Sequence, residues 1–168
     1  MSANRSRRMV FCGVALERLE LLAAAGTLEE LEGRGPTRSV LASHDVPPEE
    51  SEEADYVAQN LASLDSLALG SGPRVVVAVD AERSAVTVVE ESIGRVRLTP
   101  FDWSWVTAVF VDEPAALSAV EEARTAMSGS DVRIGEAHQP EAVTLLLEEH
   151  PLLWFLPHEL PDVLALHR

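Results

Sequence analysis

Two short apolar segments constrain the fold of this chain more than any other feature. Residues 75–79 and 106–111 consist of valine, alanine and phenylalanine, with Thr107 as the one polar member. A strand that is apolar on both alternating faces is typical of the middle of a sheet covered on both sides. We therefore expect a fold built around one β-sheet in which these two segments are central.

The second segment leads directly into a predicted amphipathic helix over residues 115–127. Asp112 and Glu113 are expected to accept hydrogen bonds from the free amides at the helix start, and Pro114 suits a first turn. Apolar side chains then recur on one helical face, while charged ones fall away from it. The apolar members are Ala116, Val120, Ala123 and Met127.

The rest of the chain shows the same two periodicities. Strands are predicted at residues 9–14, 38–42, 85–89, 95–98 and 132–134. Helices are predicted at residues 16–25, with a further turn at 27–31, from 46–48 to 68, and from Pro140 to 149; loops are expected at 33–36 and 70–73. A strand or extended segment at 152–156 and then a short helix should close the chain.

This element order indicates an α+β or α/β fold. We expect a single mixed β-sheet of about five to six strands with amphipathic helices packed on it. A length of 168 residues suits one domain, predicted over residues 9–168. Residues 1–8 are expected to form a flexible basic leader.

The leader does not have the pattern of an export signal. The apolar run that follows it is soon interrupted by Glu17, Arg18 and Glu20, which a signal's hydrophobic region would not tolerate. No stretch approaches the roughly 20 apolar residues that span a bilayer. These features favour a cytoplasmic protein. The single cysteine, Cys12, fits a reducing compartment and is expected to be a buried, inert thiol.

The formal net charge of −15 bounds the classes of partner. An acidic surface repels phosphate backbones and anionic lipid, so neither nucleic acid nor a membrane is an expected partner. Such a charge also simply keeps a protein soluble. A protein partner is compatible with it, and the oligomeric state does not follow from it.

Asp80 and Asp112 are the candidates for catalysis. Each directly follows one of the two central apolar segments. If those strands ran parallel and side by side, both carboxylates would share one rim of the sheet and could hold Mg²⁺ or a hydroxyl-bearing ligand. The structural alternative is that Asp112 caps a helix and Asp80 opens a turn.

No metal or cofactor site is expected. The C-terminal region carries His150, His158, Glu159 and Asp162, with His138 before them, but their spacing does not match a helical zinc motif. The acidic residues around 49–55 lie at a helix start, where negative charge is favourable. Glycine-rich phosphate-binding motifs and a serine-nucleophile elbow are absent from the sequence.

The aromatic residues supply candidates for an interface. Trp103, Trp105, Trp154 and Phe155 are either large core side chains or binding residues. Trp154 and Phe155 lie between two prolines near the C-terminus. Because tryptophan is rarely fully buried, these two residues are the possible interaction site.

Several segments together resemble a known group of proteins. They are residues 9–25, Glu53-Ala54-Asp55-Tyr56-Val57, residues 73–80, residues 105–126, and His150-Pro151-Leu152-Leu153-Trp154-Phe155 with Glu159-Leu160-Pro161. Through them the chain resembles an uncharacterised family of actinobacterial proteins of similar length. It differs in its longer arginine-bearing leader and in lacking an aromatic motif before the acidic helix. The resemblance implies an intracellular domain and transfers no catalytic residue.

Two functional hypotheses follow. The first is a non-catalytic binding or protein-interaction module that uses Trp154 and Phe155. The alternative is a small-molecule or Mg²⁺-dependent enzyme that uses Asp80 and Asp112.

Overall fold

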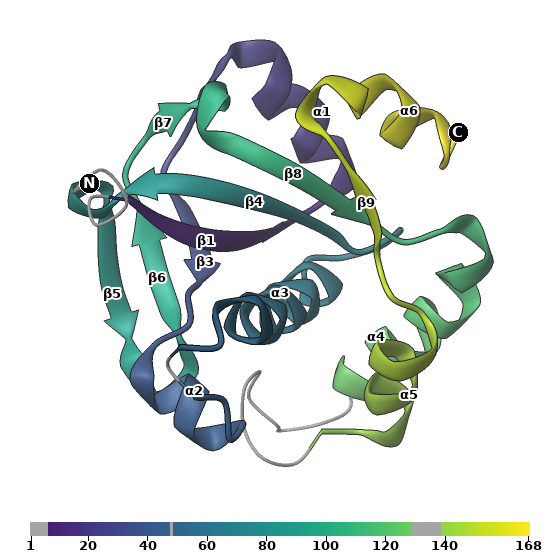
Figure 1. Ribbon diagram of the computed structural model, residues 1–168. Coiled ribbons are helices and arrows are strands. Elements are labelled where there is room, and N and C mark those ends of the chain that lie inside the picture. The colour runs from purple at the N-terminus through teal and green to yellow at the C-terminus, as the bar shows by residue number, and fades with distance from the viewer. Residues whose placement is uncertain (1–6, 48, 129–138) are drawn as a thin grey trace.

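A seven-stranded antiparallel sheet forms the centre of the molecule. The computed structural model describes residues 7–47, 49–128 and 139–168 (Figure 1). The strands are β1 (Arg7–Val14), β3 (Leu31–Arg34), β4 (Val75–Glu82), β5 (Val86–Glu90), β6 (Arg95–Leu98), β8 (Val106–Val111) and β9 (Leu153–Phe155). Their order is β5-β6-β3-β1-β4-β8-β9. The α+β class is confirmed, but the sheet has seven strands instead of five or six, and every neighbouring pair is antiparallel.

The two apolar segments are neighbouring interior strands of the sheet, the fifth and sixth of the seven in the described chain. They form β4 and β8, which pair with each other in the register Val75↔Val111. β1 covers the other edge of β4, and β9 covers the other edge of β8. Val76 and Val109 are fully buried, which is the burial that a strand covered on both faces should show.

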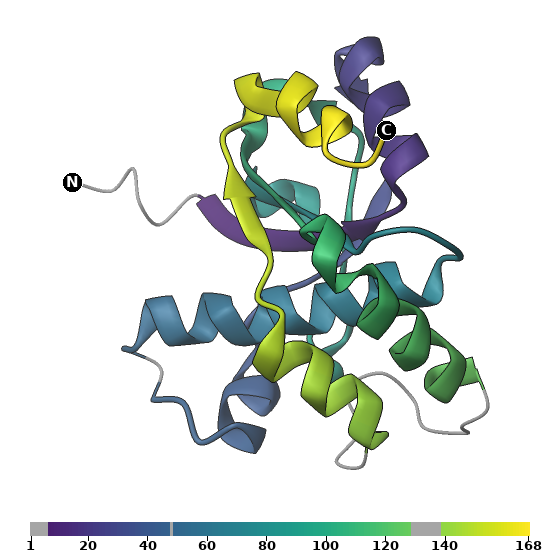
Figure 2. The same ribbon diagram turned by 90° about the vertical axis from the view of Figure 1, so that its right-hand side faces the viewer.

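One face of the sheet is covered mainly by α3 (Ser51–Ala68), which crosses β1 and β4. Its Ala58 and Ala62 pack against Phe11, Val76 and Ala78. Helices α4 (Leu117–Ser128) and α5 (Glu141–Glu149) pack together beside α3. They extend this helical layer on the same side of the sheet (Figures 1 and 2).

The opposite face carries α1 (Leu16–Ala25), α6 (Leu160–Ala165) and a two-stranded sheet of β2 (Thr27–Leu28) and β7 (Phe101–Asp102). On this face, Leu19, Leu28 and Val163 pack against the buried side chains that β1, β4 and β8 direct away from α3. Short 3₁₀ turns at Arg83–Ala85, Glu91–Ile93, Trp103–Trp105, Pro114–Ala116 and Pro157–Glu159 connect the elements. None of the helices in the described ranges combines the length and the apolar character needed to cross a bilayer.

Three predicted elements are wrong. The expected strand at residues 38–42 is helix α2 (Arg38–Ser43), because the Thr37 side chain accepts a hydrogen bond from the Val40 amide and starts a helix. The expected turn at 27–31 contains β2 and the start of β3. The expected loop at 33–36 begins with the end of β3, whose backbone pairs with β6.

Two residues that were assigned to the leader, Arg7 and Arg8, lie in a strand. β1 begins at Arg7, which pairs with Glu82 of β4, so Arg7 and Arg8 belong to the sheet. The predicted strand at residues 132–134 lies outside the described residues.

Candidate functional site

Strand β9, at one edge of the sheet, carries an exposed tryptophan. β9 is the last strand in the order and pairs only with β8 in the described chain. Trp154 in its middle is 58% exposed, and the flanking Leu153 and Leu156 are each 36% exposed. Figure 2 shows β9 running between α5 and α6 with no other element in front of it. We define Trp154, Leu156 and Phe110 as the β9 surface.

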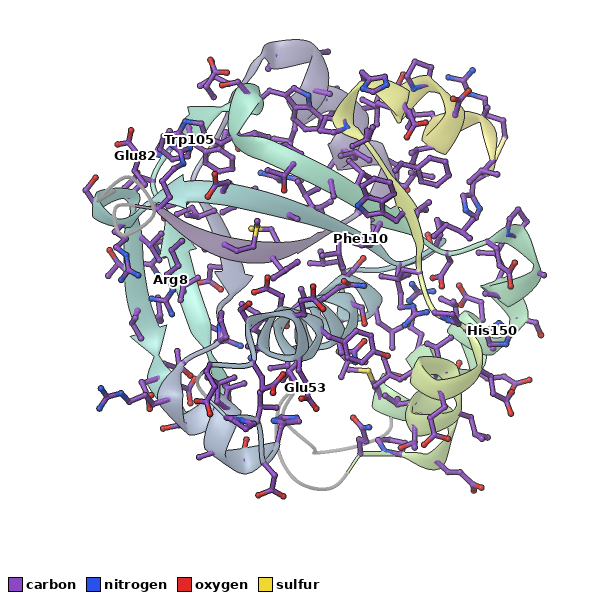
Figure 3. The ribbon with its side chains drawn as sticks, in the orientation of Figure 1. Arg8, Glu53, Glu82, Trp105, Phe110 and His150 are labelled. Atoms are coloured by element: carbon purple, nitrogen blue, oxygen red, sulfur yellow. The ribbon has the colours of Figure 1, made fainter. Side chains whose placement is uncertain are left out.

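The two candidate interaction residues lie on opposite faces of the sheet. Side chains alternate along a strand, so Trp154 and Phe155 point apart. Phe155 is partly buried against the main hydrophobic core. Trp154 is directly opposite Phe110 of β8 and therefore lies on the side of the sheet that carries α3, where Figure 3 shows Phe110. Of the two, Trp154 is the residue available to a partner.

The helical layer does not extend across this edge. α3 packs on β1 and β4, whereas Phe110 is only half-buried and Trp154 is largely exposed. An aromatic pair at the end of a sheet presents apolar area together with the backbone edge of a strand. Both features are suited to binding another polypeptide.

The segments that flank β9 in the sequence are acidic. Residues 141–168 contain five carboxylates, Glu141, Glu148, Glu149, Glu159 and Asp162, against one arginine, Arg168. The Glu159 side chain accepts a hydrogen bond of 2.8 Å from the Leu156 amide and so fixes the turn that follows β9. A positively charged segment would therefore be attracted to this edge.

Asp80 and Asp112 do not share a rim. β4 and β8 are antiparallel, and Asp112 follows the end of β8 that lies beside the start of β4. The Asp112 amide donates a hydrogen bond to the Arg74 carbonyl, which places Asp112 beside the residue before β4. Asp80 is six residues beyond Arg74 along the extended chain and therefore lies about 20 Å from Asp112. The two carboxylates cannot hold one cation together, because ligand distances are about 2–2.6 Å.

The expected structural roles of the two aspartates are also wrong. Asp80 lies within β4 and receives a 3.0 Å hydrogen bond from Arg7 Nε. Asp112 caps no helix and instead binds Arg74. Figure 3 shows the two ends, with Glu82 of β4 and Trp105 near one end of the central strands and His150 near the other. At the Asp80 end, the Arg7 guanidinium lies 5.3 Å from the Trp105 ring centre.

Arg74 and Asp112 form a buried ion pair. The carboxylate accepts bonds from Arg74 Nη2 at 2.7 Å, Nε at 3.1 Å and the Arg74 amide at 2.7 Å. Arg74 Nη2 also donates to the His150 carbonyl at 2.7 Å, and the His167 Nε2–H donates to the Asp112 carbonyl at 2.7 Å. These bonds connect the start of β4, the end of β8, α5 and the C-terminus, so the cluster holds the fold together.

The histidines do not form a metal site in the described chain. No group of three or more histidine, cysteine or acidic side chains there is arranged to hold a metal ion. His150 Nδ1 lies 3.9 Å from Glu113 Oε1, and Glu159 closes the turn after β9. His138 lies outside the described residues.

The cysteine has the buried position that was predicted. Cys12 is fully buried, and burial raises the pKa of its thiol to about 12, with the Asp65 carboxylate adding to the shift. The thiolate that would react with an electrophile is therefore strongly disfavoured.

Comparison with known proteins identifies the family. Residues 8–164 match a family described as of unknown function, DUF6912. The chain belongs to this family. No curated protein and no solved structure matches it. The predicted uncharacterised family is confirmed, while its actinobacterial origin stays a prediction.

Sequence reasoning missed two arginines that are buried in the described part of this DUF6912 chain. Arg74 and Arg34 are 1% and 0% exposed. A signal for Arg74 was present, because a charged residue next to a fully apolar strand must be neutralised where it enters the core. For Arg34 there was no comparable signal, since residues 33–36 were expected to be a loop.

Proposed function

We propose that this DUF6912 domain is a non-catalytic, cytoplasmic protein-interaction module of actinobacterial origin. Its β9 surface receives an extended, basic segment of a partner protein. The observation that supports the proposal is the exposure of Trp154 in the middle of an end strand, on the same face as the half-buried Phe110. Tryptophan is enriched among residues that dominate binding energy.

The strand edge supports an extended partner. A peptide that adds to an end strand forms main-chain hydrogen bonds with it and places alternate side chains on each face. On the α3 side, apolar side chains of the segment would contact Trp154 and Phe110. Lysine or arginine side chains would face the carboxylates around β9, including Glu159 and Asp162.

A defined probe tests this proposal. Labelled peptides that alternate valine with lysine, serine or glutamate are titrated with the full chain, and fluorescence anisotropy reports binding. The lysine series should bind, and added salt should weaken it because exposed charges are screened. Trp154→Glu should weaken binding at least about 30-fold, the effect of losing a residue that contributes about 2 kcal/mol.

The matched control is Leu21→Glu, which places the same charge at another exposed apolar residue, on α1. It should bind the lysine series as the native chain does. Thermal melts of both variants establish that they fold. Unchanged binding by Trp154→Glu, or equal binding of the glutamate series, would contradict the proposal.

A further inference from the structure

A separate cavity of about 250 Å³ lies between α3 and strands β1, β3 and β6. Glu32, Asp65 and Arg95 supply its charged lining, and Ala68 and Leu69 supply apolar wall. Figure 1 shows β3 and β6 on one side of β1 and β9 on the other, so this cavity is distinct from the β9 surface. It does not depend on the function proposed above.

Close packing of α3 on β1 positions the cavity. A Cβ atom on Gly13 would lie 2.2 Å from the Ala62 carbonyl oxygen and 3.1 Å from Asp65 Cβ. Glycine at this position lets the helix backbone approach the strand and brings Asp65 close to the sheet. The carboxylate of Asp65 is thereby fixed relative to the neighbouring strands.

Asp65 is held by a buried arginine and remains partly accessible. Arg34 Nε and Nη2 donate to its two carboxylate oxygens at 2.7 and 2.8 Å, and Arg34 Nη1 donates to the Ile93 carbonyl at 2.7 Å. The side chain of Arg34 is fully buried, while that of Asp65 is 26% exposed. The carboxylate is therefore oriented from behind and has a face toward the cavity that it lines.

Arg95 brings a second positive charge to the same face. It is directly opposite Arg34 in the β3–β6 ladder, and opposed residues share a face of the sheet. The charge of Arg34 is neutralised by Asp65, and Arg97 of β6 lies 3.5 Å from both Glu30 and Glu32. Within the described residues the Arg95 side chain donates no hydrogen bond and forms no ion pair, and Glu90 of β5 is its cross-strand neighbour in the β5–β6 ladder. Arg95 lines a cavity whose other charged lining residues are Glu32 and Asp65.

We propose that this cavity binds a free α-amino acid. The carboxylate of the amino acid pairs with Arg95, because a guanidinium binds a carboxylate through two parallel hydrogen bonds. The ammonium group is placed at Asp65 and Glu32, and the side chain lies against Ala68 and Leu69. Sites for drug-sized molecules run to about 300–1,000 Å³, so a volume of 250 Å³ suits a ligand of amino-acid size.

The opposite charges of the lining distinguish a zwitterion from simpler ligands. A plain carboxylate would pair with Arg95 but would leave unused the acceptor capacity of Asp65 and Glu32 that Arg34 and Arg97 do not engage. A plain amine would satisfy the carboxylates but would meet the Arg95 charge. An amino acid supplies both charges at a short, fixed separation.

Thermal melts and calorimetric titrations of the full chain test the assignment. The panel consists of the free amino acids, acetate, propionate and simple alkylamines. At about 100 times its Kd, a ligand of the native state should raise the Tm of a domain of this size by about 5–10 °C. At least one amino acid should do so, while acetate, propionate and the amines should not.

Arg95→Gln should abolish this shift, and Glu32→Gln should reduce it. Arg18→Gln is the matched control, since Arg18 is an exposed arginine of α1, on the other face of the sheet, and does not line the cavity. It should bind as the native chain does, and cooperative melting of each variant shows that it folds. Absence of any amino-acid response, undiminished binding by Arg95→Gln, or equally tight binding of acetate would overturn the proposal.

Discussion

Removing Asp112 tests the contribution of the buried ion pair to stability. Arg74 and Asp112 have side chains that are 2% and 0% exposed. In Asp112→Ala, the Arg74 guanidinium would stay in the core with only the His150 carbonyl at 2.7 Å and Ser63 Oγ at 3.5 Å. Breaking a buried pair on one side typically costs about 3–5 kcal/mol, because an uncompensated charge remains. We expect a loss of that size in the free energy of unfolding.

Asp80→Ala is the matched control. Its pair with Arg7 is 35% and 40% exposed, and such surface pairs contribute about 0–1 kcal/mol. For a domain of this size, 1 kcal/mol corresponds to about 2–4 °C in Tm. Asp112→Ala should therefore lower the Tm by about 6–20 °C and Asp80→Ala by at most about 4 °C, measured by circular dichroism.

A double variant separates lost charge pairing from lost packing. Arg74→Met with Asp112→Leu removes both charges, so it should be more stable than Asp112→Ala alone. Recovery should be incomplete, because the Arg74 amide also donates to the Asp112 carboxylate at 2.7 Å and would lose this acceptor. Urea unfolding of Arg74→Met, of Asp112→Leu and of the double variant gives the coupling energy. An Asp112→Ala cost within about 1 kcal/mol of the Asp80→Ala cost would refute the reasoning.

Two further predictions concern the packed core. Burial raises the pKa of Cys12 from 9.0 to about 12, so the contribution of its thiol to stability is complete below pH 9.0 and is lost as the pH rises toward 12. Cys12→Ala should therefore flatten the fall in the free energy of unfolding over that pH range. An identical fall in the native chain and the variant would contradict this prediction. Gly13→Ala should destabilise at the upper end of about 1–3 kcal/mol, since its Cβ would lie 2.2 Å from the Ala62 carbonyl oxygen. Gly35→Ala should lower the free energy of unfolding by less, because its Cβ would meet only the flexible end of Arg8 at 3.1 Å. Equal losses of Tm in the two glycine variants would count against the packing argument.

The sequence predicted the elements whose periodicity is strong. β4, β8 and α3 carry continuous apolar patterns, and each was found where expected. The failures are short segments for which tertiary contacts decide. Residues 38–42 include Ser39, Val40 and Ala42, yet Thr37 starts a helix there. Gly33 joins a strand because it pairs with Val96 of β6.

The candidate catalytic site depended on the relative direction of two strands. The periodicity of a sequence does not reveal that direction. Apolar strands suit either parallel or antiparallel pairing when both faces are covered. Antiparallel pairing of β4 and β8 separates Asp80 from Asp112 and brings Asp112 to Arg74 instead. Trp154 was easier to select, because a large aromatic side chain between prolines near a chain end has few places in which to be buried.

The two edges of the sheet differ in a way that bears on the proposed interaction. β5, at one edge, has exposed Val88 and Val89, but its pairing with β6 is interrupted by an irregularity between Val88 and Glu90. Such interruptions twist an edge and discourage further pairing. β9, at the other edge, pairs with β8 in unbroken register. It offers only a three-residue strand, Leu153–Phe155, so backbone pairing alone can supply few hydrogen bonds. The affinity of a partner must then depend mainly on the Trp154 side chain, which is why substitution of that residue decides the proposal.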